Sequence, residues 1–567
     1  MQFRNSFQRF FDDPGNRKTL VRASVAGLVI IVAVVLFQLF KGRSYPKDLY
    51  IDSVAAPVAS IVEQIKMDRP YYNKKIRNKT VLFYKKNHNK TKWLEFKGPN
   101  RNYSTYLDAI KDASQYGLNP EHYDVKAIDK DLKALFDNKK RTPQEVAAMD
   151  VRVTASFFLF TTHLIEGRIR TAGYGDFIWK RNVPKENDVD LLLENSSGNL
   201  SEIIEELHPK HEQYEKLRKA LAEYRKLDES VKIELTSGSL KGVIKPGTKH
   251  PSIPKIRHRL SLTDVKPYDV GDDSLHYDDK LVEAVKMFQT RHNLVADGII
   301  SQATLKYLNQ PFSRKVQLIE VNLERIRWLP DKYGDDYVSI NVPEYMMRVY
   351  HNGKKKLEMK VVLGSEFNAT PIFNDSLEYV VFSPTWNVPA SILEEEFIPE
   401  LKKNPLAFDP ERFVITKNGK EIDPEEEDWN DEDLDPSQYK MTERPNEENS
   451  LGLVKFMMPN NYNVYLHDSP AESLFRKNKR AYSHGCIRLE KPVEFAKYLL
   501  RDNSKWDEKA IRESLNLEEP KTVPLKKKYH VEIEYRTVWV DEKGLIHFRE
   551  DIYGHDQRQI AMLNKIE

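Results

Sequence analysis

The stretch Tyr482-Ser483-His484-Gly485-Cys486-Ile487-Arg488 holds the only cysteine of the 567-residue chain, nineteen positions after His467. A single thiol cannot close an internal disulfide, so Cys486 is either a small buried apolar residue or a free reactive group. A thiol with an ordinary pKa is mostly protonated at neutral pH, and a nucleophilic cysteine therefore needs a proton acceptor or a positive neighbour. His484 and His467 are the two candidate acceptors.

The spacing places both imidazoles within reach of the sulfur. His484 lies two residues before Cys486, which in a strand puts both side chains on one face, and His467 belongs to a preceding strand predicted at 463–466. Gly485 permits a tight backbone approach, and the amides of residues 484–486 can face a developing oxyanion. This combination favours acyl transfer through a thioester; the alternative is an inert cysteine buried beside a core histidine.

The N-terminal segment indicates export. Residues 23–40 are apolar except for Ser24 and Gln38, and such a run spans roughly 27 Å as a helix, close to the hydrocarbon thickness of a bilayer. Basic residues outnumber acidic ones before it, which predicts residues 1–22 in the cytoplasm. A cleaved signal peptide is the alternative, but the run is longer than a signal-peptide core and no small-x-small site follows. We expect a membrane anchor, with everything after residue 45 outside the cytoplasm.

Composition predicts several domains and no nucleic-acid partner. Charged residues make up 31% of the chain but the net charge is only +3, so no basic footprint for nucleic acid is visible. A soluble part of about 520 residues is too large for one core and predicts three or four units. Residues 45–238 are expected to form a helical scaffold domain, with amphipathic stretches at 103–116, 144–165 and 200–226.

Glycine and proline residues between 237 and 254 mark a boundary, and residues 240–311 are predicted to form a small, partly helical unit. Leu281, Ala284, Val285 and Phe288 share one helical face. Asp297-Gly298 predicts a turn, and Ser301 is placed to cap a short final helix.

Residues 315–560 are predicted to form a predominantly β domain. The character changes to strands from Val316, with β-rich runs at 336–342, 346–351, 357–363 and 379–384. Near the other end, residues 530–535 alternate apolar and charged side chains, a turn follows at 541–544, and 545–548 return, which predicts a half-exposed hairpin.

An acidic segment interrupts this domain. Ten of the fifteen residues from Glu421 to Asp435 are acidic, which is typical of a solvated, mobile surface. The alternative is an insertion at about 392–447 that forms a lid over the site, with 392–413 as its ordered helical part.

The motif resembles that of the L,D-transpeptidases, the penicillin-insensitive peptidoglycan cross-linking enzymes with a cysteine nucleophile. The resemblance rests on His467 and the 482–488 stretch. It extends to the large, membrane-anchored members with a helical scaffold, a three-helix peptidoglycan-binding-like unit, here 240–311, and a lidded catalytic domain. Further segments carry it: 322–330, 384–389, 449–452, Lys455-Phe456, Pro459-Asn460 and 551–553. Two departures are Ser301, where the family has Gly, and Pro445-Asn446, where the lid return has Pro-Gly.

The resemblance implies roles for individual residues. Cys486 would be the nucleophile and His467 the general base and acid. Ser483, His484 and Gly485 would shape the site and the oxyanion hole, and Arg488 would hold the loop or a substrate carboxylate, unless it is only a structural ion-pair partner. Trp386 and Asn387 would line the substrate cleft, unless Trp386 is a core aromatic, together with an unassigned position beside Leu466.

The implied reaction is cross-linking of peptidoglycan tetrapeptide stems through a cysteine thioester, without a metal or other cofactor. Resolution of the thioester by water would make a carboxypeptidase, and resolution by a protein amine would make a wall-attachment enzyme. A non-catalytic wall-binding scaffold is the alternative from another class. The resemblance further implies a single-pass protein of the bacterial inner membrane, with its catalytic domain in the periplasm and other cell-wall enzymes among its partners.

Overall fold

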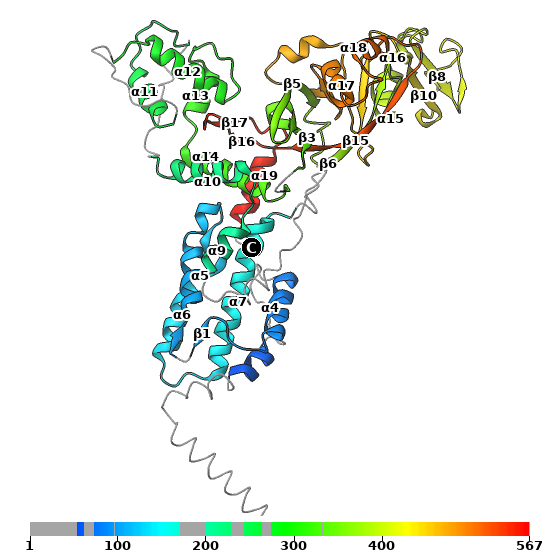
Figure 1. Ribbon diagram of the computed structural model, residues 1–567. Helices are drawn as coiled ribbons and strands as arrows, with labels where there is room; N and C mark the ends of the chain where they lie inside the picture. The colour runs from blue at the N-terminus through cyan, green and yellow to red at the C-terminus, as the bar shows by residue number, and fades with distance from the viewer. Residues whose placement is uncertain are drawn as a thin grey trace, which may run out of the picture.

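The computed structural model describes residues 54–61, 73–95, 97–170, 200–227, 243–263, 274–330 and 333–565. It has a helical N-terminal domain, a small helical unit and a β-rich domain, which meet near a central helix, α14 (Phe312–Ile326) (Figure 1). The fold is therefore multidomain α+β, as predicted. The expected anchor at 23–40 lies outside the described residues. Within the described ranges, no helix is both long and apolar enough to cross a membrane.

The N-terminal domain is built around α7 (Pro143–Glu166). Its start is fixed by a capping box, because Thr142 accepts from the Glu145 amide while the Glu145 carboxylate accepts from that of Thr142. Seventeen of its 24 residues are buried, so α7 is the central helix of the domain. Around it lie α4 (Lys74–Lys86), α5 (Arg101–Lys111), α6 (Val125–Asp137), α9 (Leu200–Leu207) and the short strands β1 (Leu94–Glu95) and β2 (Gly98–Pro99). The next helix, α10 (Glu212–Arg225), packs against α14 instead.

The amphipathic stretch at 200–226 is two helices. α9 ends at Leu207 and α10 begins at Glu212, and Pro209 lies between them. Proline removes a backbone donor and its ring clashes with the preceding turn, which explains the break.

The small helical unit has the three predicted helices, α11 (Ile253–Ser261), α12 (Asp279–Arg291) and α13 (Gln302–Leu308). The Ser301 hydroxyl accepts from the Thr304 amide at 3.3 Å, which confirms the predicted cap. Gly298 has φ +73° in the predicted turn. Arg291 ties the unit to the β-rich domain by donating to the Ile546 carbonyl at 2.6 Å.

The expected change to strands at Val316 is wrong, because residues 312–326 form α14. Its apolar side packs with α10 and with a hairpin near the C-terminus in one buried cluster that includes Leu217, Ile319, Leu323 and Val538. The helix belongs to the junction between domains rather than to the sheet.

Charged residues at the C-terminal end of α14 join the domains. The Glu324 carboxylate accepts from the backbone amides of Arg168 and Ile169 at 2.5 and 2.7 Å, just after the C-terminal end of α7. Arg325 pairs with Asp556 of α19 (His555–Asn564) at 2.7 Å. Because these buried groups satisfy one another across the junction, they fix how the N-terminal domain meets the β-rich one.

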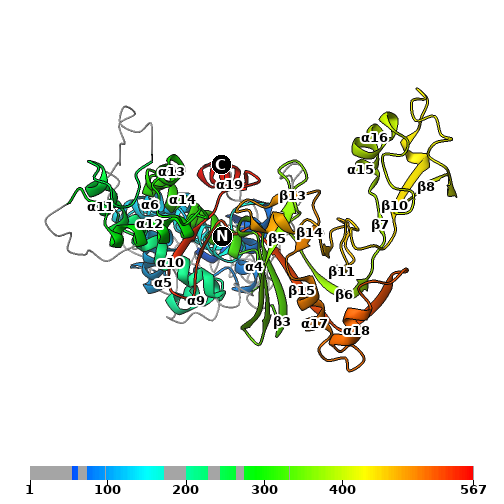
Figure 2. The same cartoon turned by 90° about the horizontal axis from the view of Figure 1, so that it is seen from above.

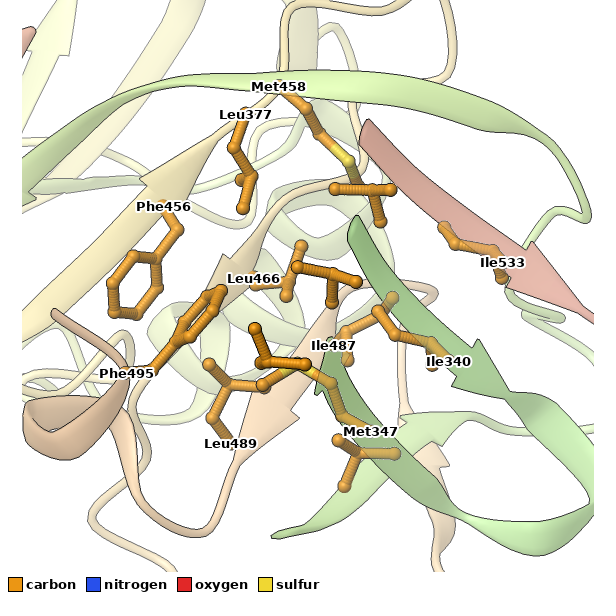
Figure 3. Close-up of a cluster of buried hydrophobic side chains, with 14 of the residues drawn as sticks. Ile340, Met347, Leu377, Phe456, Met458, Leu466, Ile487, Leu489, Phe495 and Ile533 are labelled. Carbon is orange, nitrogen blue, oxygen red and sulfur yellow. The ribbon is translucent and has the colours of Figure 1, made fainter. Parts of the chain in front are cut away.

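The β-rich domain is a nine-stranded sheet of order β13-β5-β14-β12-β11-β6-β15-β3-β4. β4 also pairs with β5, so the sheet closes on itself. An apolar interior that includes Met347, Leu377, Phe456 and Phe495 fills it (Figure 3). The strands are β3 (Asp336–Asn341), β4 (Met346–His351), β5 (Lys354–Gly364), β6 (Asn374–Phe382), β11 (Val454–Met457), β12 (Leu466–His467), β13 (Ala481–Ser483), β14 (Ile487–Leu489) and β15 (Lys521–Glu534). Helices α17 (Pro492–Leu500) and α18 (Glu508–Glu513) follow β14.

The predicted C-terminal hairpin is partly wrong. Residues 530–534 belong to β15, which lies inside the sheet between β6 and β3. Its charged positions Glu532 and Glu534 are buried, held by His530, Ser339 and Arg536, so the alternating pattern misidentified an interior strand as half exposed. The hairpin is formed by β16 (Val538–Val540) and β17 (Ile546–Phe548), and its apolar side chains are buried.

The insertion between β6 and β11 folds around a core of its own. Its four-stranded sheet has the order β7-β10-β8-β9, and it stands at the side of the β-rich domain away from the helical parts (Figure 2). The acidic segment is largely exposed, as predicted, but Trp429 within it is buried in this core. The elements are β7 (Trp386–Asn387), α15 (Ala390–Ile392), a π-helical turn (Leu393–Phe397), α16 (Ile398–Lys403), β8 (Phe413–Lys417), β9 (Lys420–Glu421) and β10 (Tyr439–Glu443).

Candidate active site

Cys486 lies immediately before β14, and His467 ends β12. These two strands are parallel neighbours in the sheet, with Leu466 opposite Ile487 and His467 opposite Arg488. The Ile487 amide donates to the Tyr465 carbonyl at 3.1 Å, which extends the pairing to the residues before each strand. The two distant segments of the motif are thus brought side by side, as the sequence predicts.

Side-chain alternation sorts these residues between two faces of the sheet. Leu466 and Ile487 are fully buried in the apolar interior. Because successive side chains point to opposite faces, their neighbours in the two strands lie on the other face. Lys455 of β11 is paired with His467 and completes this group. We call it the cysteine face, formed by Lys455, Tyr465, His467, Cys486 and Arg488.

The thiol of Cys486 is partly exposed, so a substrate can reach it. Its sulfur lies 3.7 Å from the Asn463 carbonyl oxygen. Burial raises the pKa of the thiol, while hydrogen bonding with Tyr465 and the positive charges of Arg488 and Lys455 act in the opposite direction. Among the residues that the structure describes, the sulfur makes no hydrogen bond to a histidine. The resting group is therefore a neutral thiol rather than a thiolate paired with imidazolium.

His467 is also neutral at rest. Its side chain is 4% exposed, and burial together with the positive charge of Arg488 lowers its pKa to about 3. His467 and Cys486 are diagonal neighbours across the parallel pair, because His467 is opposite Arg488 and Cys486 lies two residues before Arg488. His467 is thus a free base beside a protonated thiol, and proton transfer must accompany attack on the substrate.

This resting state predicts the pH dependence of alkylation. Cys486 is the sole cysteine, so iodoacetamide labelling reports on one group. Because burial raises its thiol pKa, the rate should keep rising above pH ~8.5, the ordinary thiol pKa, and show no shoulder near pH 6.5. Mass spectrometry of samples quenched between pH 5 and 10 measures it. A rate that levels off below pH 8 would instead indicate a preformed thiolate.

Residues 484–485 form a bend between β13 and β14, so the strand is not continuous. The inference that His484 and Cys486 share a strand face is therefore wrong. Gly485 has φ +114°, a conformation that other residues adopt only under strain. A Cβ there would meet only the Asn368 carbonyl at 3.9 Å, so glycine is required by the backbone angle rather than by a close approach.

Hydrogen bonds hold this bend and engage the Gly485 amide. The Ser483 hydroxyl donates to the Cys486 carbonyl at 2.6 Å and accepts from the Gly485 amide at 3.2 Å. The Thr370 hydroxyl donates to the Gly485 carbonyl at 2.9 Å. The Gly485 amide is thus engaged, whereas that of Cys486 donates no hydrogen bond within the described part of the chain. Ser483 therefore orders the bend, and the Cys486 amide is the better oxyanion donor.

His484 turns away from the sulfur toward the insertion. Its Nε2 lies 2.7 Å from Oε1 of Glu396, in the π-helical turn before α16, and both side chains are exposed. Of the two candidate bases, His467 is therefore the one on the cysteine face.

Lys455 and Tyr465 are site residues that the sequence reasoning missed. The Tyr465 ring lies 5.5 Å from the Lys455 ammonium and 5.7 Å from the His467 ring. Strand periodicity gives a signal for Tyr465, which is two positions before His467. Lys455 is a single charge in the apolar run 453–458, and its place in the site follows only from the pairing of β11 with β12.

The predicted cleft residues lie at the base of the insertion. Trp386 in β7 packs edge-on against Phe397 with ring centres 5.9 Å apart, and Asn387 accepts from the Thr442 hydroxyl at 3.1 Å. Both positions pair with β10 in the insertion's own sheet, and Trp386 packs against the core of the insertion. The position beside Leu466 stays unassigned.

Comparison with known proteins identifies the domains of this chain. Residues 335–521 match the family model of the L,D-transpeptidase catalytic domain, which includes the whole cysteine face. Residues 335–521 are an L,D-transpeptidase catalytic domain. Residues 78–221 match a scaffold domain and 261–308 match the model named "Putative peptidoglycan binding domain". The predicted combination of scaffold, peptidoglycan-binding unit and transpeptidase domain is confirmed.

Proteins similar to this chain in sequence or structure are named L,D-transpeptidases. The chain is 32% identical over 251 residues to a "Putative L,D-transpeptidase" of Haemophilus influenzae, covering 44% of this chain and 50% of the relative. It therefore spans half the length of that protein. An L,D-transpeptidase structure from Mycobacterium smegmatis is 13% identical, with a TM-score of 0.17 over 35% of this chain and 58% of that one. One from Xylanimonas cellulosilytica is 11% identical, with a TM-score of 0.17 over 53% and 100%. These superpositions are too weak to carry an argument about the L,D-transpeptidase domain.

Proposed function

We propose that this protein is a peptidoglycan L,D-transpeptidase that cross-links stem peptides through a thioester on Cys486. The observation that carries the proposal is the cysteine face, on which a solvent-accessible thiol shares a sheet surface with His467 inside an L,D-transpeptidase catalytic domain. The division into a cytoplasmic N-terminus (1–22), anchor (23–40), scaffold (45–238), binding unit (240–311) and catalytic domain (315–560) belongs to the same proposal. We also propose that the protein lies in the bacterial inner membrane, with its catalytic domain in the periplasm.

The reaction has two halves. In the first, the Cys486 sulfur attacks the carbonyl carbon of the third stem residue while His467 takes the thiol proton. The carbon–nitrogen bond then breaks, His467 returns the proton to the leaving D-alanine amine, and a thioester remains. In the second, the side-chain amine of a diamino acid on another stem attacks the thioester, the carbon–sulfur bond breaks, and the thiol is regenerated. The Cys486 amide stabilises the oxyanion in both halves.

The experiment that tests this function is product analysis with defined tetrapeptide stems. The full-length protein should release D-alanine and form cross-links between third-position residues, and mass spectrometry should find an acyl adduct on Cys486. Release of D-alanine with only tripeptide products would indicate a carboxypeptidase. Transfer to protein amines would indicate an attachment enzyme. A carbapenem that leaves Cys486 unmodified in folded protein would support the non-catalytic scaffold.

The insertion at about 392–447 is proposed to act as a lid. Support comes from Glu396, which reaches His484 beside the nucleophile although it belongs to a unit with its own core. A lid favours transfer to an amine because it excludes water from the thioester.

Breaking this contact should shift the products toward hydrolysis. With Glu396→Gln, we expect the ratio of tripeptide to cross-linked product to rise by up to about fivefold, since an exposed pair is worth at most about 1 kcal/mol. Glu400→Gln is the matched control, because this exposed acid lies four residues further along the same helical segment and pairs with Lys403 rather than with His484. An unchanged product ratio for Glu396→Gln would contradict the role of this contact in a lid.

A further inference from the structure

A buried threonine holds the peptide unit between Gly485 and Cys486. The Thr370 hydroxyl donates to the Gly485 carbonyl at 2.9 Å and accepts from the Gly364 amide at 2.9 Å. Its side chain is 1% exposed. A hydroxyl has one proton, and the Gly364 amide can only donate to its oxygen, so that proton is left for the Gly485 carbonyl. The carbonyl is therefore held in one direction.

Holding this carbonyl also aims the Cys486 amide. The Gly485 carbonyl and the Cys486 N–H belong to one planar peptide unit, in which the two bonds point in opposite directions. Gly485 has φ +114° and no side chain, so its own backbone restrains the unit only weakly. The hydrogen bond from Thr370 therefore sets the direction in which the oxyanion donor points.

Thr370 is itself held by a tyrosine near the end of the chain. Its backbone amide donates to the Tyr553 hydroxyl at 3.2 Å, and that hydroxyl donates to the Gly364 carbonyl at 2.8 Å. Tyr553 is buried, and burial raises the pKa of its hydroxyl to about 12, so the proton needed for this bond is retained. A Cβ at Gly364 would lie 2.7 Å from the Thr370 nitrogen, so this approach requires glycine.

Tyr553 lies beyond residues 335–521, which match the L,D-transpeptidase catalytic domain. Its position is fixed by further buried hydrogen bonds. The Tyr553 amide donates to the Tyr535 hydroxyl at 2.9 Å, and that hydroxyl donates to Asp551 at 2.7 Å. The Asp551 carboxylate also accepts from the Asp556 amide of α19 at 2.7 Å. The C-terminal segment that meets α14 thus also supports the catalytic bend.

We propose that Thr370 and Tyr553 are positioning residues that aim the Cys486 amide at the oxyanion formed on the attacked carbonyl. The inference rests on the proposed function, because the oxyanion belongs to that reaction. Thr370 acts through the Gly485–Cys486 peptide unit, and Tyr553 acts through Thr370. A hydrogen bond weakens as its N–H turns away from the acceptor, so a bend that is free to rotate loses stabilisation of the transition state rather than binding of the substrate.

Two reactions of Cys486 in the full-length protein separate aiming from a general loss of structure. Attack on an acyl donor forms an oxyanion, whereas alkylation by iodoacetamide displaces iodide from a saturated carbon and forms none. Thr370→Val keeps the shape of the side chain and removes its hydroxyl. It should lower the maximum rate of single-turnover acylation by a tetrapeptide stem about 10- to 100-fold. The peptide concentration at half-maximal rate and the alkylation rate should stay within about twofold, and Thr370→Ser should recover most of the acylation rate.

Tyr553→Phe should slow acylation about three- to tenfold, because its hydroxyl acts one hydrogen bond farther from the bend. This comparison retains Thr370 and so does not depend on the folding of Thr370→Val. Tyr529→Phe is the matched control, since the buried Tyr529 hydroxyl donates to the Leu499 carbonyl at 3.5 Å, away from the bend. Combining Thr370→Val with Tyr553→Phe should cost less than the product of the two effects, because both act on one peptide unit.

Ser383→Ala is the matched control for the lost Thr370 hydroxyl. The buried Ser383 hydroxyl accepts from the Leu517 amide at 2.9 Å and donates to the Ser514 carbonyl at 3.0 Å, outside the bend. It should leave acylation unchanged. The positioning role is wrong if Thr370→Val leaves acylation unchanged or slows alkylation equally.

Acylation by a carbapenem separates this inference from the proposed function. Opening of the lactam ring by the thiol also forms an oxyanion, so Thr370→Val should slow it about 10- to 100-fold as well. Slower carbapenem acylation in this variant, together with no cross-linking of stem peptides by the wild type, would uphold the positioning role and refute the proposed function instead.

Discussion

Replacing Cys486 by alanine should lower kcat/KM for cross-linking by at least about 10⁴-fold, because removal of a covalent nucleophile leaves only binding and oxyanion stabilisation. Stability should change little. The side chain is small and partly exposed, and its sulfur lies 3.7 Å from its nearest backbone acceptor. The measurements are cross-link formation from defined stems and thermal unfolding of the same preparation.

Cys486→Ser is the companion variant, since it changes only the sulfur atom to oxygen. This variant has no thiol, so it should form no thioester with the stem peptide. Its melting temperature should stay within about 2 °C of that of the wild type. A large loss of stability in either variant would mean that Cys486 is a packing residue, which was the alternative reading of a lone cysteine. Residual cross-linking near the wild-type rate would place the nucleophile elsewhere.

The sequence predicts that His467 and Cys486 share the site, but it does not predict their protonation states. The pairing of β12 with β14 follows from two apolar segments on either side of a polar loop, and it brings His467 and Cys486 to one face. The protonation of these groups depends on burial, which a local pattern does not contain. Burial keeps the thiol and the imidazole neutral, whereas the motif alone suggests a thiolate ionised by its neighbour.

Other differences have the same origin in tertiary structure. Residues 530–534 alternate like a half-exposed strand, yet Glu532 and Glu534 are buried because Ser339, His530 and Arg536 satisfy them within the sheet. Residues 316–326 lie next to strands in sequence but form a helix that packs on α10. Lys455 enters the site only through strand order. Such partners come from segments far apart in the chain, so no window of sequence reveals them.

Replacing His467 by glutamine should lower the rate of thioester formation by about 10²–10⁴-fold, the usual contribution of a general base. His484→Gln should cost less than about tenfold, because that ring faces Glu396 rather than the cysteine face. Single-turnover acylation by a tetrapeptide stem measures both, and added imidazole should partly rescue His467→Gln alone. The reverse ranking would assign the base to His484.

His467→Gln should also make the stability of the protein less sensitive to acid. Burial and the Arg488 charge hold the pKa of His467 at about 3, below the ordinary value of about 6.5. The unfolded chain therefore binds a proton that the folded one does not, and this site lowers stability as pH falls from about 6.5 toward 3, by up to about 1.4 kcal/mol per pH unit. His467→Gln lacks this proton, so its unfolding free energy should fall less steeply than that of the wild type over that window. Parallel curves from urea unfolding between pH 4 and 7 would show that His467 is already exposed to solvent and protonated in the folded state, and the neutral imidazole required as base would then be absent at acidic pH.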